Sequence, residues 1–191
     1  SKGDFLKSIE TLEPLVKSQD LTFNIIWDLI EARTKLCPDI LNFNLNSMEL
    51  TEHRQTIREL LSLSLTLNKR VEPNENIYVG IMFQSIGEYR KSIYPLELAV
   101  NDPRYSRTAL LALSTAYQKL SNSEMNILIL EAASEKFIDD PVKLNALGYS
   151  LAVADKDLSR AESLVSAALD IDSDKPAYLD SIGWVYFKQE L

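Results

Sequence analysis

The sequence predicts an all-α fold of stacked antiparallel helix pairs, an α-solenoid, on three observations. First, a small residue recurs at intervals of 34, 34 and 35 residues, at Gly80, Ser114, Gly148 and Gly183. Second, a branched apolar residue precedes each small residue, and a large apolar residue follows it three positions later. Third, the 191 residues include only five glycines and are 46% hydrophobic, which suits helices around a core.

Close helix packing explains the repeated small residue. Side chains spaced three and four residues apart share one face of a helix, and a small residue in that face lets a second helix approach closely. Glycine inside a helix costs about 1 kcal/mol relative to alanine. Three glycines at one period therefore indicate a packing purpose, and chance spacing in a helical protein is the alternative.

The second helix of each expected pair carries small, large and small residues in turn. We expect these to be Ser92, Leu96 and Ala99 in the first pair and Ala161, Val165 and Ala168 in the third. The second pair has a looser version of the pattern, with Met125, Ile129 and Ala132.

This period and pattern resemble the tetratricopeptide repeat, a 34-residue helix-turn-helix unit of the form W-x2-L-G-x2-Y…A-x3-F…P. The likeness covers residues 73 to 191 and departs from the pattern at Asn76, which replaces an apolar residue, and at Ser114, which replaces glycine. It implies a right-handed superhelix in which the first helix of each pair lines the inner, concave face.

The N-terminal part is less regular. Residues 1–17 resemble the second helix of a truncated repeat, and residues 18–70 a degenerate repeat with an insertion. Within the latter we expect a helix over 21–36 ended by Pro38, then a short helix or loop over 39–49. A long helix capped by Thr51 is expected to run to about Leu67.

Residues 71–191 are expected to form three regular repeats and the first helix of a fourth. The expected helices are 74–86, 89–101, 105–120, 123–136, 141–154, 158–171 and 176–190. Asp140 and Asp174, close before Pro141 and Pro176, supply capping or turn acids with proline in the first helical turn.

Composition narrows the function classes. A net charge of −8 and a pI near 4.8, without basic clusters, argue against nucleic acid or an anionic membrane surface as the main partner. No run of 18 apolar residues predicts a transmembrane segment. The start, Ser1 to Asp4, does not resemble a signal peptide, and Cys37 alone cannot form an internal disulfide, so the compartment stays open.

We expect no catalytic, cofactor or metal site. His53, the single histidine, lies between Glu52 and Arg54 at an expected solvated helix start, and a zinc site needs several His or Cys ligands. The acidic run over 170–174 lacks the glycine and the bidentate glutamate of a calcium loop. No phosphate-binding glycine motif occurs.

The resemblance instead implies a binding surface on the first helices. The residues expected there are Asn74, Ile77, Ile81, Gln84, Thr108, Leu111, Thr115, Gln118, Asn145, Tyr149, Asp180, Trp184 and Lys188. Amide side chains can pair with a peptide backbone while aromatic rings supply contact area. Tyr149 and Trp184 could instead be core residues between repeats. A basic clamp for acidic tails is not evident, since only Lys119 and Lys188 are candidates.

Two functions are therefore considered. The favoured one is a non-catalytic scaffold that binds a protein or peptide on the concave face. The alternative is a self-assembling module, a dimer or stack through residues 176–191, whose apolar face has no second helix to cover it. The segments Asn145–Tyr149 and Asp180–Val185 are similar to bacterial repeat proteins, including envelope lipoprotein adaptors. Envelope, periplasm and cytoplasm all remain open.

Overall fold

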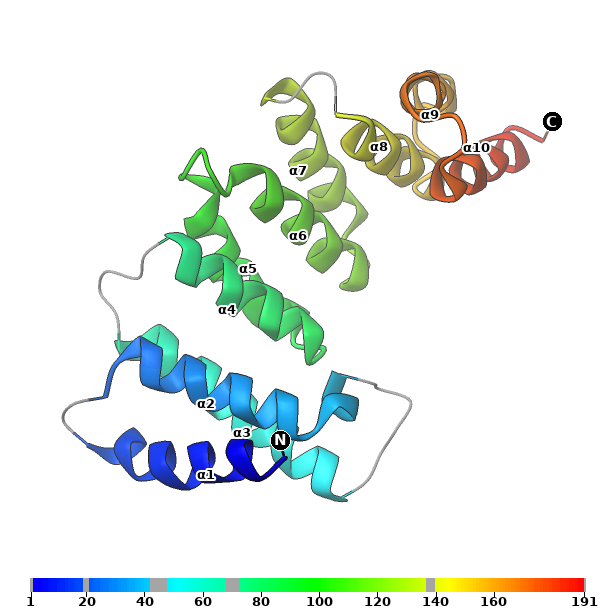
Figure 1. The fold of residues 1–191 in the computed structure, drawn as a ribbon. Coiled ribbons are helices and arrows are strands. Elements are labelled where there is room, and N and C mark those ends of the chain that lie inside the picture. The colour runs from blue at the N-terminus through cyan, green and yellow to red at the C-terminus, as the bar shows by residue number, and fades with distance from the viewer. Residues whose placement is uncertain (1, 19–20, 42–47, 68–72, 137–139, 191) are drawn as a thin grey trace. The chain divides into compact units, whose positions relative to one another are not determined.

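The structure is a computed structural model that describes residues 2–18, 21–41, 48–67, 73–136 and 140–190. Every regular element within these ranges is a helix, which confirms the all-α prediction (Figure 1). The chain divides into two compact units, Ser1–Pro95 and Leu96–Leu191, called here the N-terminal and C-terminal units. The division falls at Pro95 inside a helix, where proline lacks the N–H that an α-helix uses.

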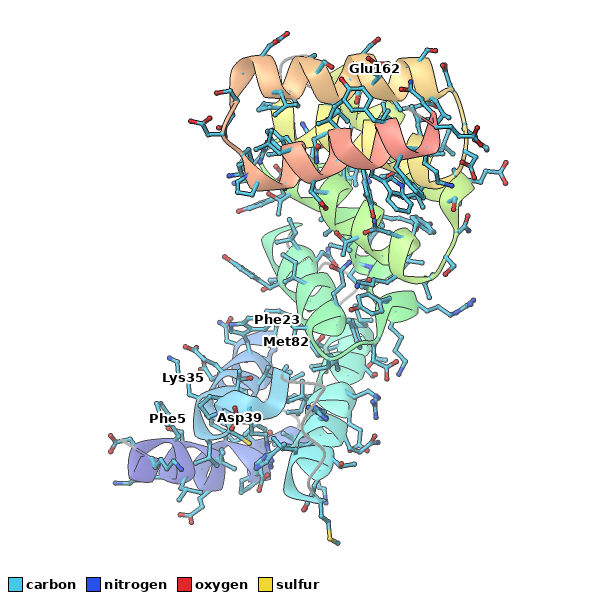
Figure 2. All side chains as sticks on the ribbon, turned by 90° about the vertical axis from the view of Figure 1, so that its right-hand side faces the viewer. Phe5, Phe23, Lys35, Asp39, Met82 and Glu162 are labelled. Atoms are coloured by element: carbon cyan, nitrogen blue, oxygen red, sulfur yellow. The ribbon has the colours of Figure 1, made fainter. Side chains whose placement is uncertain are left out.

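The N-terminal unit contains a succession of helices around one apolar core. They are α1 (Lys2–Leu12), the 3₁₀ helix η1 (Glu13–Lys17), α2 (Phe23–Leu36), the 3₁₀ helix η2 (Pro38–Leu41), α3 (Met48–Leu67), α4 (Pro73–Ser85) and the first half of α5 (Tyr89–Val100). α2 packs against both α1 and α3. Ile30, Ile57 and Phe83 are fully buried in this core. At its edge Lys35 of α2 lies over the Phe5 ring of α1, with Nζ 5.9 Å from the ring centroid (Figure 2).

The expected start of the long helix is wrong. Thr51 does not cap the long helix, because α3 already begins at Met48. Leu50 is buried in the core, and this apolar contact favours an additional helical turn before Thr51. Within the described residues of this unit, Thr22 caps α2: its Oγ1 accepts a hydrogen bond from the Ile25 N–H at 3.3 Å. Most of the expected insertion, residues 42–47, lies outside the described residues.

The C-terminal unit is a series of paired helices. After the second half of α5 come α6 (Ser106–Lys119), α7 (Ser123–Lys136), α8 (Pro141–Val153), α9 (Leu158–Ile171) and α10 (Pro176–Lys188). α6 packs on α7, α8 packs on α9, and α10 contacts both α8 and α9 (Figure 1). From α4 onward each helix begins and ends within two residues of the expected position. Asp140 caps α8 as expected, whereas Lys175 stands at the N-cap of α10 and makes no side-chain cap.

The first helix of each repeat ends in the same turn. Gly87, Ser121, Asp155 and Glu190 all have positive φ, at 79°, 56°, 51° and 61°, and they recur at the repeat period. After α6 the Asn122 N–H donates to the Tyr117 carbonyl at 2.9 Å, and after α8 the Lys156 N–H donates to Leu151 at 2.9 Å. These bonds satisfy carbonyls that the helix end leaves open. Only the first of these turns has glycine, the residue that tolerates this backbone without strain.

Gly148 lies where α8 and α9 approach most closely. A Cβ added to it would meet Val165 Cγ2 at 2.6 Å and the Ala161 carbonyl oxygen at 2.8 Å. Both residues are fully buried, so neither has room to move away. At Gly183 of α10, by contrast, an added Cβ would meet nothing within 4 Å. This face of α10 is therefore uncovered in the described part of the chain.

The pair α6–α7 replaces this glycine contact with a polar one. The predicted register of α7 is wrong by one residue, because Asn126, Leu130 and Ala133 are buried in place of Met125, Ile129 and Ala132. Asn126 thus occupies the position of Ala161, and its Oδ1 accepts a 2.6 Å hydrogen bond from Ser114 Oγ on α6. Asn126 is larger than the alanine at the equivalent position of α9, and Ser114 replaces the glycine that faces it. The two substitutions are compatible because the two side chains hydrogen-bond to each other. Met125 and Ile129 misled the prediction because they are the more apolar residues.

Candidate functional site

A groove of about 430 Å³ runs across α6, α8 and α10 of the C-terminal unit. We call it the inner groove. Its lining combines small, polar and apolar side chains: Leu111, Ser114, Thr115 and Gln118 from α6, Val142, Asn145, Ala146, Tyr149 and Ser150 from α8, and Ala177, Asp180 and Ser181 from α10. The residues of each helix are spaced three and four apart, which places them on one face. Asp180 is the single charged side chain in this lining.

Asn145 lies near the middle of this lining. Its Oδ1 is buried and has no hydrogen-bond partner among the described residues. A buried acceptor without a partner carries an unfavourable desolvation free energy of about 1–3 kcal/mol. An N–H group of a ligand could remove that penalty by donating to this oxygen, and Gln118 offers a second, exposed amide on the neighbouring helix.

A buried hydrogen-bond network supports the floor of the groove. Asn126 accepts from Ser114 Oγ at 2.6 Å and donates through Nδ2 to Ser150 Oγ at 2.9 Å. The side chain of Asn126 is only 4% exposed, and it links α6, α7 and α8. Ser114 and Ser150 line the groove while Asn126 lies behind them. The network therefore fixes the spacing of the two helices that carry Gln118 and Asn145.

A second hollow of about 430 Å³, the aromatic pocket, adjoins the inner groove. It is lined by Tyr149, Leu179, Asp180, Gly183, Trp184 and Phe187. The Trp184 and Phe187 ring centroids are 5.3 Å apart, with planes inclined by 31°. Lys188 Nζ lies 5.7 Å from the Trp184 centroid and pairs with Asp155 at 2.8 Å. Tyr149 and Asp180 border both hollows, so the two form one continuous surface.

A charged cluster holds the N-terminal ends of the groove helices. Asp140 accepts a hydrogen bond from Arg107 of α6 and forms an ion pair with Lys143 of α8, whose Nζ is 3.0 Å away and whose side chain is 0% exposed. Burial raises the pKa of Asp140, but the hydrogen bonds from Arg107 and Lys143 outweigh it and lower the pKa to about 2. Burial lowers the pKa of Lys143 and raises that of the neighbouring Tyr178 of α10. Sequence reasoning missed this cluster because a lysine in a regular helix ordinarily lies on the surface.

The structure places the predicted site residues unevenly. Six of them line the inner groove: Leu111, Thr115, Gln118, Asn145, Tyr149 and Asp180. Trp184 lies in the aromatic pocket and is 38% exposed, so it is not a core residue. Lys188 is engaged by Asp155, and Thr108 is exposed on α6 beyond the groove lining.

The predicted residues on α4 belong to the N-terminal unit, and those with described side chains differ in exposure. Ile77 is 4% exposed and therefore part of the core, contrary to the expectation. Gln84 is half-buried and donates to Ser92 Oγ at 3.3 Å, while Ile81 is exposed. The side chain of Asn74 lies outside the described residues.

The remaining chemistry-bearing residues are engaged in structural contacts. His53 is half-buried, with Nδ1 3.2 Å from Arg33 Nη1, rather than free at the surface. The pKa of Arg33 is lowered by burial and raised by Glu52, with burial the larger effect. Within the described ranges no group of three or more His, Cys, Asp and Glu side chains could hold a metal ion. None of the described helices combines the length and apolarity needed to cross a membrane.

The N-terminal unit has its own hollow, which the sequence did not indicate. It measures about 520 Å³ and lies between η1, α2 and α3. Its apolar wall is formed by Val16, Leu29, Leu60 and Leu63, and Glu13, Lys17, Thr56 and Glu59 border it. Of these acids, Glu13 accepts from Arg33 and Glu59 from Gln55.

Comparison with known proteins places this fold. No protein-family model matches the chain. A TPR repeat-containing protein of Pseudomonas aeruginosa is 41% identical over 51 residues, which are 27% of this chain and 9% of that protein. This chain therefore matches only a small part of that relative's length.

Several solved structures have a fold similar to that of this chain over most of its length, at low sequence identity. MamA from Desulfovibrio magneticus RS-1 has a TM-score of 0.59 at 16% identity over 83% of this chain and 86% of the other. YrrB, described as a TPR protein with an unusual peptide-binding site, has a TM-score of 0.58 at 13% sequence identity. The match covers 93% of this chain and 87% of YrrB. The TPR2AB domain of yeast Sti1, solved in complex with pHSP90, has a TM-score of 0.53 at 16% sequence identity. The match covers 100% of this chain and 81% of the Sti1 chain.

At such identities these likenesses concern the fold, while the Pseudomonas match concerns the sequence. Together with the recurring small residues and the helix pairs, they show that the chain has an all-α helical repeat fold like that of tetratricopeptide repeat proteins, and that 51 of its residues resemble such a protein in sequence.

Proposed function

We propose that this chain is a protein-interaction module whose inner groove binds an extended or helical segment of a partner protein. The observation that carries the proposal is the buried Oδ1 of Asn145, which has no hydrogen-bond partner among the described residues. It lies in a groove lined by α6, α8 and α10, each the first helix of its repeat. One structural neighbour, YrrB, is described as having an unusual peptide-binding site. Another, the TPR2AB domain of Sti1, was solved in complex with pHSP90. They support a binding role for this fold.

The groove suits a peptide backbone better than a small polar metabolite. Leu111, Val142 and Ala177 supply apolar contact, and the amides of Gln118 and Asn145 can each exchange hydrogen bonds with a peptide unit. A net hydrogen bond contributes about 0.5–1.5 kcal/mol, so affinity would depend on several such bonds and on apolar burial together.

Binding to a displayed library of random 12-residue peptides tests the proposal. Peptides enriched by the wild-type chain should bind Asn145→Ala and Gln118→Ala about tenfold more weakly each, since each variant loses roughly 1.4 kcal/mol of hydrogen bonding. Ser163→Ala is the matched control, because Ser163 is exposed on α9 and donates only within its own helix. Failure to enrich any peptide, or equal binding by all variants, would contradict the proposal.

A second candidate function is self-association through α10. The observation that favours it is the uncovered face of this helix, where an added Cβ at Gly183 meets nothing and Leu179 and Phe187 are 52% and 67% exposed. Two copies could bring these faces together around a two-fold axis. Sedimentation equilibrium should then show a dimer that Phe187→Glu dissociates, whereas a wild-type monomer at high protein concentration excludes it.

A further inference from the structure

We propose that the junction of the inner groove and the aromatic pocket selects a lysine or arginine side chain of the bound partner, with Asp180 as the counter-charge. This inference rests on the proposed function and adds the chemistry of the residue that the site prefers. The junction is defined by Tyr149, Asp180 and Trp184, which lie on adjacent helices α8 and α10.

Asp180 is an available anion. It lines both hollows, it is exposed, and it makes no hydrogen bond or ion pair with the other described residues. The residues beside it in the two linings are neutral, so nothing in the linings offsets its charge. A carboxylate that caps no helix and pairs with no base is unlike Asp140 and Asp155, which are engaged by Arg107 and Lys188.

The aromatic side chains add a second attraction for the same charge. The faces of tryptophan and tyrosine rings attract cations, by about 0.5–1 kcal/mol where the site is exposed to water. The chain already shows this at Trp184, where Lys188 Nζ lies 5.7 Å from the ring centroid. The charge of Lys188 is offset by Asp155 at 2.8 Å, which leaves Asp180 as the uncompensated charge beside this ring.

The apolar residues fit the rest of such a side chain. Leu179, Gly183 and Phe187 line the aromatic pocket away from Asp180, and the methylene groups of lysine or arginine can pack on them. The uncovered Gly183 leaves space for this packing. A glutamate or aspartate at the same place would meet Asp180 as a like charge. The site therefore discriminates by charge as well as by contact area.

The test selects binders from the peptide library separately with three proteins: wild type, Asp180→Asn and Asp170→Asn. Asp180→Asn keeps the side-chain shape and removes the charge, while Asp170→Asn removes an equal charge from an exposed position on α9 outside both hollows. Wild type and Asp170→Asn should enrich lysine or arginine at one fixed peptide position, and Asp180→Asn should lose that enrichment.

An enriched arginine peptide and its citrulline analogue then measure the interaction. Replacing arginine by neutral citrulline should weaken wild-type binding about tenfold, as should Asp180→Asn with the arginine peptide, and the two changes together should do no more than one. Sodium chloride should weaken only the charged pair. If peptides bind and depend on Asn145 but show no cation preference, or ignore Asp180→Asn, this inference fails while the proposed function stands. If no peptide depends on Asn145, the proposed function fails first.

Discussion

Identical substitutions at two equivalent glycines should have opposite effects on stability. In Gly148→Ala the new Cβ would meet the Ala161 carbonyl oxygen at 2.8 Å and Val165 Cγ2 at 2.6 Å. The carbonyl belongs to the backbone of α9, and a buried valine has a stiff χ1 angle, so relief requires the two helices to separate. Gly183→Ala meets nothing within 4 Å.

The magnitudes follow from two opposing contributions. Forcing extra atoms into a packed interface destabilises by about 1–3 kcal/mol, and a backbone contact belongs at the upper end of that range. Replacing a helical glycine by alanine returns about 1 kcal/mol in both variants. Gly148→Ala should therefore destabilise by about 2 kcal/mol and Gly183→Ala stabilise by about 1 kcal/mol, a difference of about 3 kcal/mol.

Urea unfolding followed by tryptophan fluorescence measures this difference. The chain has two tryptophans, and a Trp27→Phe background leaves Trp184 of the C-terminal unit as the reporter. Micromolar protein keeps any self-association through α10 from contributing. Stabilisation of both variants, or equal destabilisation, would show that the recurring glycine does not mark a close helix contact at Gly148, and the packing argument would be wrong.

Three further outcomes test other parts of the C-terminal unit. Ser121→Gly should stabilise by about 1 kcal/mol in thermal unfolding, because glycine adopts the left-handed backbone at that turn without strain; no gain would contradict that reading of the turn. Asn126→Leu should destabilise by about 1–3 kcal/mol in urea, since it leaves the buried network around Ser150 without its central member; a neutral effect would show that the network is dispensable. Asp140 has a lowered pKa of about 2, so its stabilising contribution is complete above its ordinary pKa of 3.8 and is lost as pH falls toward 2. The stability difference between wild type and Asp140→Asn, measured from pH 5 to pH 2, should therefore shrink across that window, and a constant difference would contradict the assigned role.

The helices and their pairing could be predicted because packing repeats. The small residue, the branched residue before it and the large residue after it recur on the same face, and helix ends follow from proline and acidic caps. The α7 register was missed because Asn126 is polar and Met125 is apolar, so hydrophobicity alone selects the wrong residue. The spacing of 34 residues from Ser92 to Asn126 would have found it.

The candidate site was harder to predict than the fold. Groove positions on α6, α8 and α10 followed from the repeat, but burial depends on neighbours that a single sequence does not reveal. Ile77 occupies the position equivalent to Leu111 and Asn145, yet it is buried in the N-terminal unit. The Lys143–Asp140 pair depends on three helix ends meeting, which no local pattern encodes.

This contrast indicates where specificity resides in the chain. Residues that hold helices together are constrained to recur, as Leu113, Leu147 and Ile182 do, because each performs the same packing task in each repeat. The groove positions carry no such task and change from repeat to repeat, from Leu111 to Asn145 to Asp180. The surface therefore passes from apolar on α6 to neutral polar on α8 to anionic on α10. A partner segment bound along it would be recognised by that order, which predicts an apolar residue, then a backbone contact, then a cationic residue.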